Sequence, residues 1–120
     1  MRLELVPVPV SDVDRAKQFY VEHVGFTADH DHQLGGGVRF VQLTPPGSAC
    51  SIVIGTGITP SPPGSAQGLL LVVQDIEAAR AALTERGVKI SEVRDEPWGS
   101  RHAYFHDLDG NSWQLQQPGR

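Results

Sequence analysis

Apolar runs separated by glycine and proline predict four strands in the first half of the chain: residues 3–10, 26–32, 38–44 and 49–54. The first run contains Pro7 and Pro9. Because proline donates no backbone hydrogen bond, this strand is expected at the edge of a sheet. One helix is predicted between the first two strands, since Ser11 and Asp14 resemble a capping box and apolar residues follow at helical spacing up to Gly25.

The second half repeats this order of elements. A strand at residues 69–73 precedes a helix at 76–86, and three further strands are predicted at 88–93, 101–106 and 112–116. A shift of 63 residues places residues 6–54 on 69–117 without a gap, so that Asp12 falls on Asp75 and Ile52 on Leu115. Such a repeat implies two copies of one supersecondary unit, related by pseudo-twofold symmetry. The functional site is then expected to lie between the two copies.

The sequence therefore predicts an α+β fold of two tandem βαβββ modules. The first module spans residues 1–54 and the second 68–117, and both belong to one domain of residues 1–120. Residues 55–67 are rich in proline and glycine, so we expect a linker without regular structure between the modules.

The composition limits the classes of function. The net charge of −4 argues against a nucleic-acid-binding surface, which needs a basic stripe. The longest apolar run, residues 69–73, is too short to cross a bilayer, and no charged-then-apolar leader precedes Leu3. Cys50 is the only cysteine, which fits a reducing compartment. We expect a cytoplasmic protein without nucleic-acid or membrane partners.

Three sets of motifs follow the order of the repeat: Val10-Ser11-Asp12 before Phe19-Tyr20 and Gly25-Phe26, Val73-Gln74-Asp75 before Gly87, and the turn Asp107-Leu108-Asp109-Gly110-Asn111 before Trp113 and Leu115. Together with the repeat they resemble the vicinal-oxygen-chelate superfamily, which includes glyoxalase I, extradiol dioxygenases, and the fosfomycin- and bleomycin-resistance proteins. The resemblance covers nearly the whole chain. It implies curved mixed sheets around a cavity, usually in a homodimer.

The resemblance also implies where a divalent metal would bind. Metal-binding members take ligands from the first and last strands of each module, which correspond here to Leu5, Ser51, Gly68 and Gln114. Leucine and glycine supply no donor, serine is a poor neutral ligand, and one amide oxygen does not hold a divalent ion. We therefore expect no metal and no other cofactor, and loss of the usual glyoxalase or dioxygenase chemistry.

Alternation of side chains along strands predicts a polar group in the cavity. The resemblance places Tyr104 at a cavity tyrosine of extradiol dioxygenases, and alternation adds His102, His106 and, from the other module, Arg39. The expected ligand-binding residues are Arg39, Ser51, Trp98, His102, Tyr104 and Gln114. His102 and Tyr104 are also the catalytic candidates, although no paired carboxylate or nucleophile is identified beside His102. The simpler interpretation is a half-exposed strand face of mixed character.

Two further features have more than one interpretation. Trp98 next to Gly99 is expected either to stack over a planar ligand or to close the mouth of the barrel. His30 and His32 share a strand face between Asp29 and Asp31, which gives half of a metal site. A solvated strand edge, whose charges discourage pairing with another chain, explains them better.

Three functions are compatible with these observations. The first is a metal-free protein that binds or sequesters a small aromatic or antibiotic-like compound, similar to bleomycin-resistance proteins, in a homodimer. The second is a lyase, isomerase or dioxygenase with a displaced metal or none, which requires donors such as His102, His106 and Gln114 to converge. The third is an interaction module whose cavity is filled by side chains. We favour the first.

Overall fold

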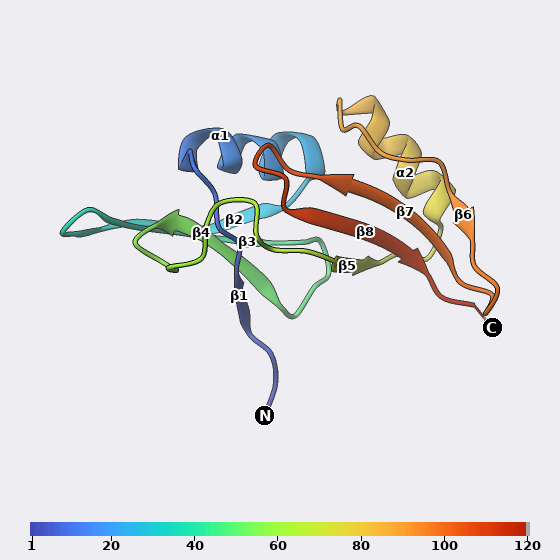
Figure 1. The fold of residues 1–120 in the computed structure, drawn as a ribbon, viewed down its shortest axis with the longest axis horizontal. Coiled ribbons are helices and arrows are strands. Elements are labelled where there is room, and N and C mark those ends of the chain that lie inside the picture. The colour runs from blue at the N-terminus through green and yellow to red at the C-terminus, as the bar shows by residue number, and fades with distance from the viewer. Residues whose placement is uncertain (120) are drawn as a thin grey trace.

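Two four-stranded sheets, one from each half of the chain, form the fold (Figure 1). The structure, a computed structural model, describes residues 1–119. The first sheet has the order β1-β4-β3-β2 and the second the order β5-β8-β7-β6. The first four strands are β1 (Leu5–Pro7), β2 (Thr27–Gly35), β3 (Val38–Thr44) and β4 (Ser51–Thr56). The second four are β5 (Leu69–Val72), β6 (Arg94–Asp95), β7 (Arg101–His106) and β8 (Ser112–Gln117).

The two sheets have the same topology. In each of them the first strand runs parallel to the last, and the other neighbours are antiparallel. This arrangement confirms the predicted α+β fold of two tandem βαβββ modules. The proline-containing strand β1 lies at an edge of its sheet, as expected.

The helices lie on one side of the sheets (Figure 1). Helix α1 (Val13–Gln18) continues directly into a π-helix (Phe19–Val24), which ends at Gly25 with φ +93°, and α2 (Ile76–Glu85) is the helix of the second module. The predicted start of α1 is one residue early, because Asp12 is the N-cap and accepts a hydrogen bond from the backbone N–H of Arg15. With ten residues, α2 is too short to span a bilayer, and no other helix within residues 1–119 has the length or apolar character to do so.

One hydrophobic core lies between the helices and the sheets and continues through both modules. The first sheet contributes Val41, Leu43, Ile52 and Ile54, and the second contributes Ala103, Phe105, Trp113 and Leu115. Where the modules meet, the Trp113 ring packs against Tyr20 and Phe26, with ring centres 5.8 and 5.6 Å away. Burying one large apolar side chain contributes about 1.5–3 kcal/mol, so this shared core holds the modules together.

A buried polar cluster also joins the modules. Asp107, 2% exposed, accepts hydrogen bonds at Oδ2 from the Tyr20 hydroxyl at 2.6 Å and from Asn111 Nδ2 at 2.8 Å. Trp113 Nε1 donates to the Tyr20 hydroxyl at 3.0 Å, and Asn111 Nδ2 also donates to the Pro9 carbonyl at 2.8 Å. Burial, reinforced by the neighbouring Asp107 carboxylate, raises the pKa of Tyr20 well above its usual value. The cluster links the π-helix, the segment after β1 and the turn before β8.

Two predicted boundaries are wrong. Residues 88–93 do not form a strand, and only the two-residue β6 pairs with β7. At Ser91 the backbone N–H still donates to the Tyr104 carbonyl at 2.9 Å, but the Tyr104 N–H donates to the Ser91 hydroxyl at 2.8 Å, so that a side chain replaces one of the two ladder hydrogen bonds. Strand β4 runs to Thr56, and the segment without helix or strand is therefore 57–68 rather than 55–67.

Candidate functional site

The face of each sheet that points away from the helices carries most of the candidate residues; we call it the open face. On the second sheet, cross-strand pairing sets His102 beside Gln116, Tyr104 beside Gln114 and His106 beside Ser112. The residues between them in sequence are buried in the core. The predicted grouping of His102, Tyr104 and Gln114 on one face is therefore present.

A pocket of about 520 Å³ lies on this open face. Its polar walls come from Tyr104, His106, Ser112 and Gln114, and Gln67 and Gly68 of the inter-module segment close one side. The volume is typical of a small-molecule site. Gln67 was not predicted, because it lies in a segment whose path depends on tertiary contacts such as the hydrogen bond from its Nε2 to the Gly110 carbonyl at 3.4 Å.

His102 lies among four side chains at the end of β7. Its Nδ1 is 3.3 Å from the Tyr104 hydroxyl and 3.9 Å from Glu96 Oε1, and its Nε2 is 3.4 Å from Ser100 Oγ. The sequence identifies no carboxylate beside His102; in the structure the turn between β6 and β7 brings Glu96 near the imidazole, although not within hydrogen-bond distance. The imidazole can exchange hydrogen bonds with a ligand that enters beside Tyr104.

Trp98 lies on the same turn and is 68% exposed. Its ring centre is 6.3 Å from that of His102, with the two planes inclined by 63°. Gly99, with φ +94°, makes the turn possible. The indole therefore has a free face next to the polar group of the open face, and an exposed indole face can stack on a planar molecule.

Ser51 lies on the first sheet, apart from this group. It is 6% exposed, and its Oγ is 2.6 Å from Thr44 Oγ1 and 3.5 Å from Gln42 Nε2. Thr44 also donates to Asp29. The Ser51 hydroxyl is thus held by its own sheet, and this chain alone does not bring it to Tyr104 or Gln114.

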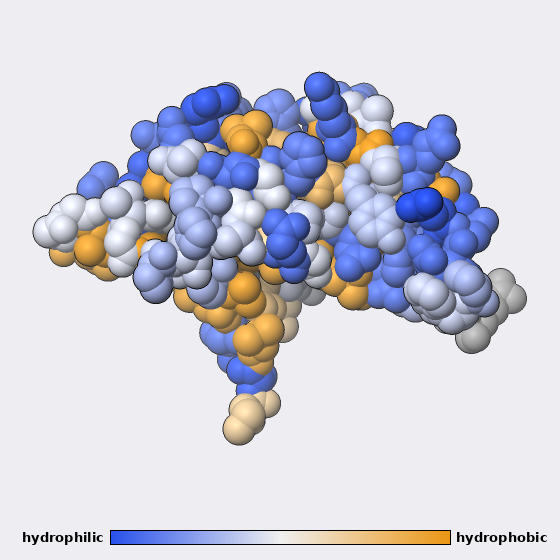
Figure 2. Space-filling model, viewed as in Figure 1, coloured by the Kyte–Doolittle hydropathy of each residue, from blue (hydrophilic) through white to orange (hydrophobic). Residues whose placement is uncertain are grey.

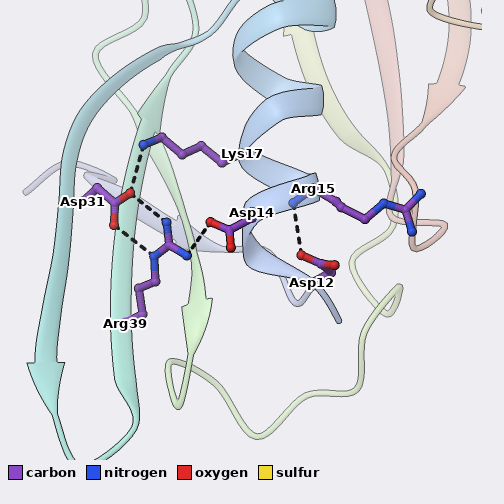
Figure 3. A network of polar contacts seen from close by, with 6 residues as sticks. All are labelled: Asp12, Asp14, Arg15, Lys17, Asp31 and Arg39. Carbon is purple, nitrogen blue, oxygen red and sulfur yellow. Dashed lines mark hydrogen bonds and ion pairs between the residues drawn. The ribbon is translucent and has the colours of Figure 1, made fainter.

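Arg39 does not belong to the expected cluster. It lies on the helix side of the first sheet, where Nε and Nη2 donate to the two carboxylate oxygens of Asp31 at 3.0 and 2.9 Å (Figure 3). Nη1 donates to Asp14 of α1 at 2.7 Å, and Lys17 Nζ donates to Asp31 at 2.9 Å. Hydrogen bonds from Arg39, and then from Lys17, lower the pKa of Asp31, and the same carboxylate raises the pKa of Arg39. Arg39 therefore fastens the β2–β3 hairpin to α1.

The positions that carry a metal in related proteins do not suit one here. Leu5 pairs with Ser51, and Gln114 pairs with Leu70 rather than with Gly68, so the second first-strand position is again a leucine. One bonded hydroxyl and one amide are a poor donor set for a divalent ion. The donors proposed for a displaced site do not converge either, because His102 and His106 lie at opposite ends of β7, about 13 Å apart at 3.3 Å per residue.

The histidines of β2 lie side by side. The ring centres of His30 and His32 are 5.6 Å apart on a strand that forms the outer edge of the first sheet, in agreement with the predicted solvated edge. Within residues 1–119 no three histidine, cysteine or acidic side chains come close enough to hold a metal ion, and the pair stays without a third ligand of these types.

Comparison with known proteins gives consistent results. Residues 2–115 match the family model described as the Glyoxalase/Bleomycin resistance protein/Dioxygenase superfamily. The structure is similar to that of TnmS3, an antibiotic binding protein from Streptomyces sp. CB03234, with 44% identity, a TM-score of 0.88, and coverage of 99% of this chain and 97% of that one. A glyoxalase/bleomycin resistance protein from the same Streptomyces is 45% identical, with a TM-score of 0.82 and coverage of 97% and 100%. The uncharacterised protein YetH of Bacillus subtilis (strain 168) is 30% identical over 116 residues, which cover 93% of this chain and 94% of YetH.

Proposed function

Because this chain belongs to the Glyoxalase/Bleomycin resistance protein/Dioxygenase superfamily, we propose that it binds and sequesters a small aromatic, antibiotic-like compound without a metal ion. The observation that carries the proposal is the open face of the second sheet, where Tyr104 and Gln114 line a pocket of about 520 Å³ and His102, on the same strand as Tyr104, lies next to the exposed indole of Trp98. The likeness to TnmS3, which is described as an antibiotic binding protein, supports a ligand of this kind.

The side chains of the open face suit binding better than turnover. Trp98 offers a flat apolar surface, and Tyr104, His102 and Gln114 offer hydrogen bonds in both directions. Stacking on an aromatic ring contributes about 0.5–1.5 kcal/mol beyond burial, and each hydrogen bond adds about 0.5–1.5 kcal/mol. A catalytic site would also need an activated nucleophile, a Lewis acid or a general acid–base pair, and the carboxylate that the structure brings near His102, that of Glu96, stays 3.9 Å away, beyond hydrogen-bond reach.

We further propose that two copies of the chain form a homodimer. Leu70 and Val72 of the edge strand β5 are 46% and 65% exposed on the open face, and Leu3 is 70% exposed on an N-terminal segment that projects from the body (Figures 1 and 2). A second copy would cover these apolar side chains and supply a further wall for the pocket. Size-exclusion chromatography with light scattering should give twice the mass of 13.0 kDa. For its compartment we propose the cytoplasm, because the lone Cys50 fits a reducing environment.

Fluorescence titration tests the binding proposal. Aromatic antibiotics added to the protein should quench the tryptophan emission, because Trp98 is exposed on the open face and Trp113 lines the pocket. The Trp98→Ala and Tyr104→Phe variants should each bind about three- to tenfold more weakly, from the loss of stacking or of one hydrogen bond. Lys89→Gln, which alters an exposed residue outside the pocket, is the control. Equal affinities for all four proteins, or no binding across a broad panel, would contradict the proposal.

A further inference from the structure

A second cavity lies between the two modules. It encloses about 600 Å³ and shares no lining residue with the pocket of the open face. One wall comes from the first module, with Val24, Phe26 and Pro45, and the other from Leu71 of β5 and Leu83 of α2. We call this cavity the inter-module groove. Its walls are mostly apolar and include Leu70 and Val72, which are 46% and 65% exposed.

Arg86 is the single charged residue that lines the groove. Within residues 1–119 its guanidinium makes no ion pair, whereas Arg39 and Arg101 each bind two carboxylates. A Cβ atom at Gly25 would clash with Arg86 Nη1, so the guanidinium lies directly against the end of the π-helix. Glycine at this position leaves room for the cation beside the groove. Its planar donors remain available and match the two oxygens of a carboxylate.

We propose that the inter-module groove binds an amphipathic monocarboxylate, such as a medium-chain fatty acid. The apolar body lies along the walls, and the carboxylate pairs with Arg86. Arg86 would repel a cationic ligand. A ligand with two negative groups would leave one of them unpaired, since no other charged residue lines the groove. The groove is large enough for a molecule of this class. This inference stands apart from the proposed aromatic-ligand site, because the two cavities share no lining residue.

Isothermal titration of the full chain with decanoate, octanoate and 1-decanol tests the charge and the chain length. One decanoate should bind per chain, and octanoate should bind at least tenfold more weakly, because each buried methylene is worth about fourfold. Arg86→Gln should weaken decanoate binding about tenfold, as expected for the loss of a charge-assisted hydrogen bond, and should leave 1-decanol binding unchanged. Lys89→Gln removes the same charge from an exposed position that does not line the groove, and should have no effect. If decanoate does not bind, or binds equally to the Arg86→Gln protein, the proposal is wrong.

A second variant tests the location. Ala82 is exposed on α2 and lines the groove, so Ala82→Trp should fill it without disturbing the core and abolish binding of decanoate and 1-decanol alike. Trp98→Ala, on the open face, should bind decanoate as the parent does, which separates this site from the proposed aromatic site. The proposal is overturned if decanoate still binds to the Ala82→Trp protein. It is also overturned if decanoate binds to neither protein and Ala82→Trp changes only the oligomeric state, because a second copy of the chain then covers the groove.

Discussion

Replacing Tyr20 by phenylalanine removes one hydroxyl group from the polar cluster that joins the two modules. The ring stays, so its packing against Phe26 and Trp113 is retained. Two hydrogen bonds are lost: the one that the hydroxyl donates to Asp107 at 2.6 Å, and the one that it accepts from Trp113 Nε1 at 3.0 Å. Tyr20 is fully buried, so water cannot replace the hydroxyl without opening the interface between the modules.

The magnitude follows from these two bonds. A hydrogen bond to a charged group contributes about 1.5–3 kcal/mol, and a buried donor left without an acceptor costs about 1–3 kcal/mol. Partial relaxation around the site reduces the sum, so we expect Tyr20→Phe to lower the free energy of unfolding by about 2–4 kcal/mol. Small domains have about 5–15 kcal/mol in total, so the variant should fold but unfold much more readily.

Urea unfolding followed by circular dichroism measures this difference. With a slope of about 1–3 kcal/mol per molar urea, the midpoint should fall by about 1–2 M at unchanged slope. Tyr104→Phe is the matched control, because it removes a hydroxyl that is half-exposed on the open face and touches only His102. The control should change stability by less than about 0.5 kcal/mol. If Tyr20→Phe is no more destabilising than Tyr104→Phe, the cluster does not hold the modules together and the reasoning fails.

Three further outcomes are expected. Hydrogen bonds from Arg39 and Lys17 lower the pKa of Asp31 in the folded protein. The Asp31 carboxylate therefore stabilises the fold above the unfolded-state pKa of about 4, and this contribution is lost as the pH falls. Asp31→Asn should lower the free energy of unfolding by about 1 kcal/mol at pH 7 and by less at pH 3, as measured by urea unfolding. Gly25→Ala should destabilise the protein by about 1–2 kcal/mol, since φ is +93° there, and an unchanged urea midpoint would contradict this. Excess EDTA should leave the melting temperature and ligand binding unchanged; a stoichiometric divalent ion at Gln114 in elemental analysis would refute the metal-free site.

The internal repeat and the apolar periodicity predict most of the helices and strands of the fold. Each strand and helix that the structure contains lies within or next to a predicted segment, because apolar periodicity and glycine or proline boundaries act locally. Alternation along β7 and β8 also placed Tyr104 and Gln114 on one face correctly, since Trp113 and Leu115 between them are clearly apolar. The faces of these two strands were predictable because one of them is strongly hydrophobic.

Arg39 was misplaced because the repeat does not have a constant offset throughout. Leu43 pairs with Ile52, nine residues on, whereas Ala103 pairs with Leu115, twelve residues on. The second hairpin is thus three residues longer, and an odd difference exchanges the two faces of the strand. A constant shift of 63 residues makes Arg39 equivalent to His102, whereas the observed pairing puts Arg39 on the opposite face of its sheet. The approach of Glu96 to His102 also could not be predicted from the sequence, because it depends on the conformation of the turn between β6 and β7.

The attachment of the two modules is almost entirely non-covalent. The turn that contains Asp107 and Asn111 reaches into the first module, where it binds Tyr20 and the Pro9 carbonyl, and the connecting segment adds only one covalent path between the halves. A protease cut within residues 57–63 would consequently yield a nicked protein that stays whole until it is denatured. Two separately expressed halves should likewise associate and reassemble, because the contacts between them are non-covalent.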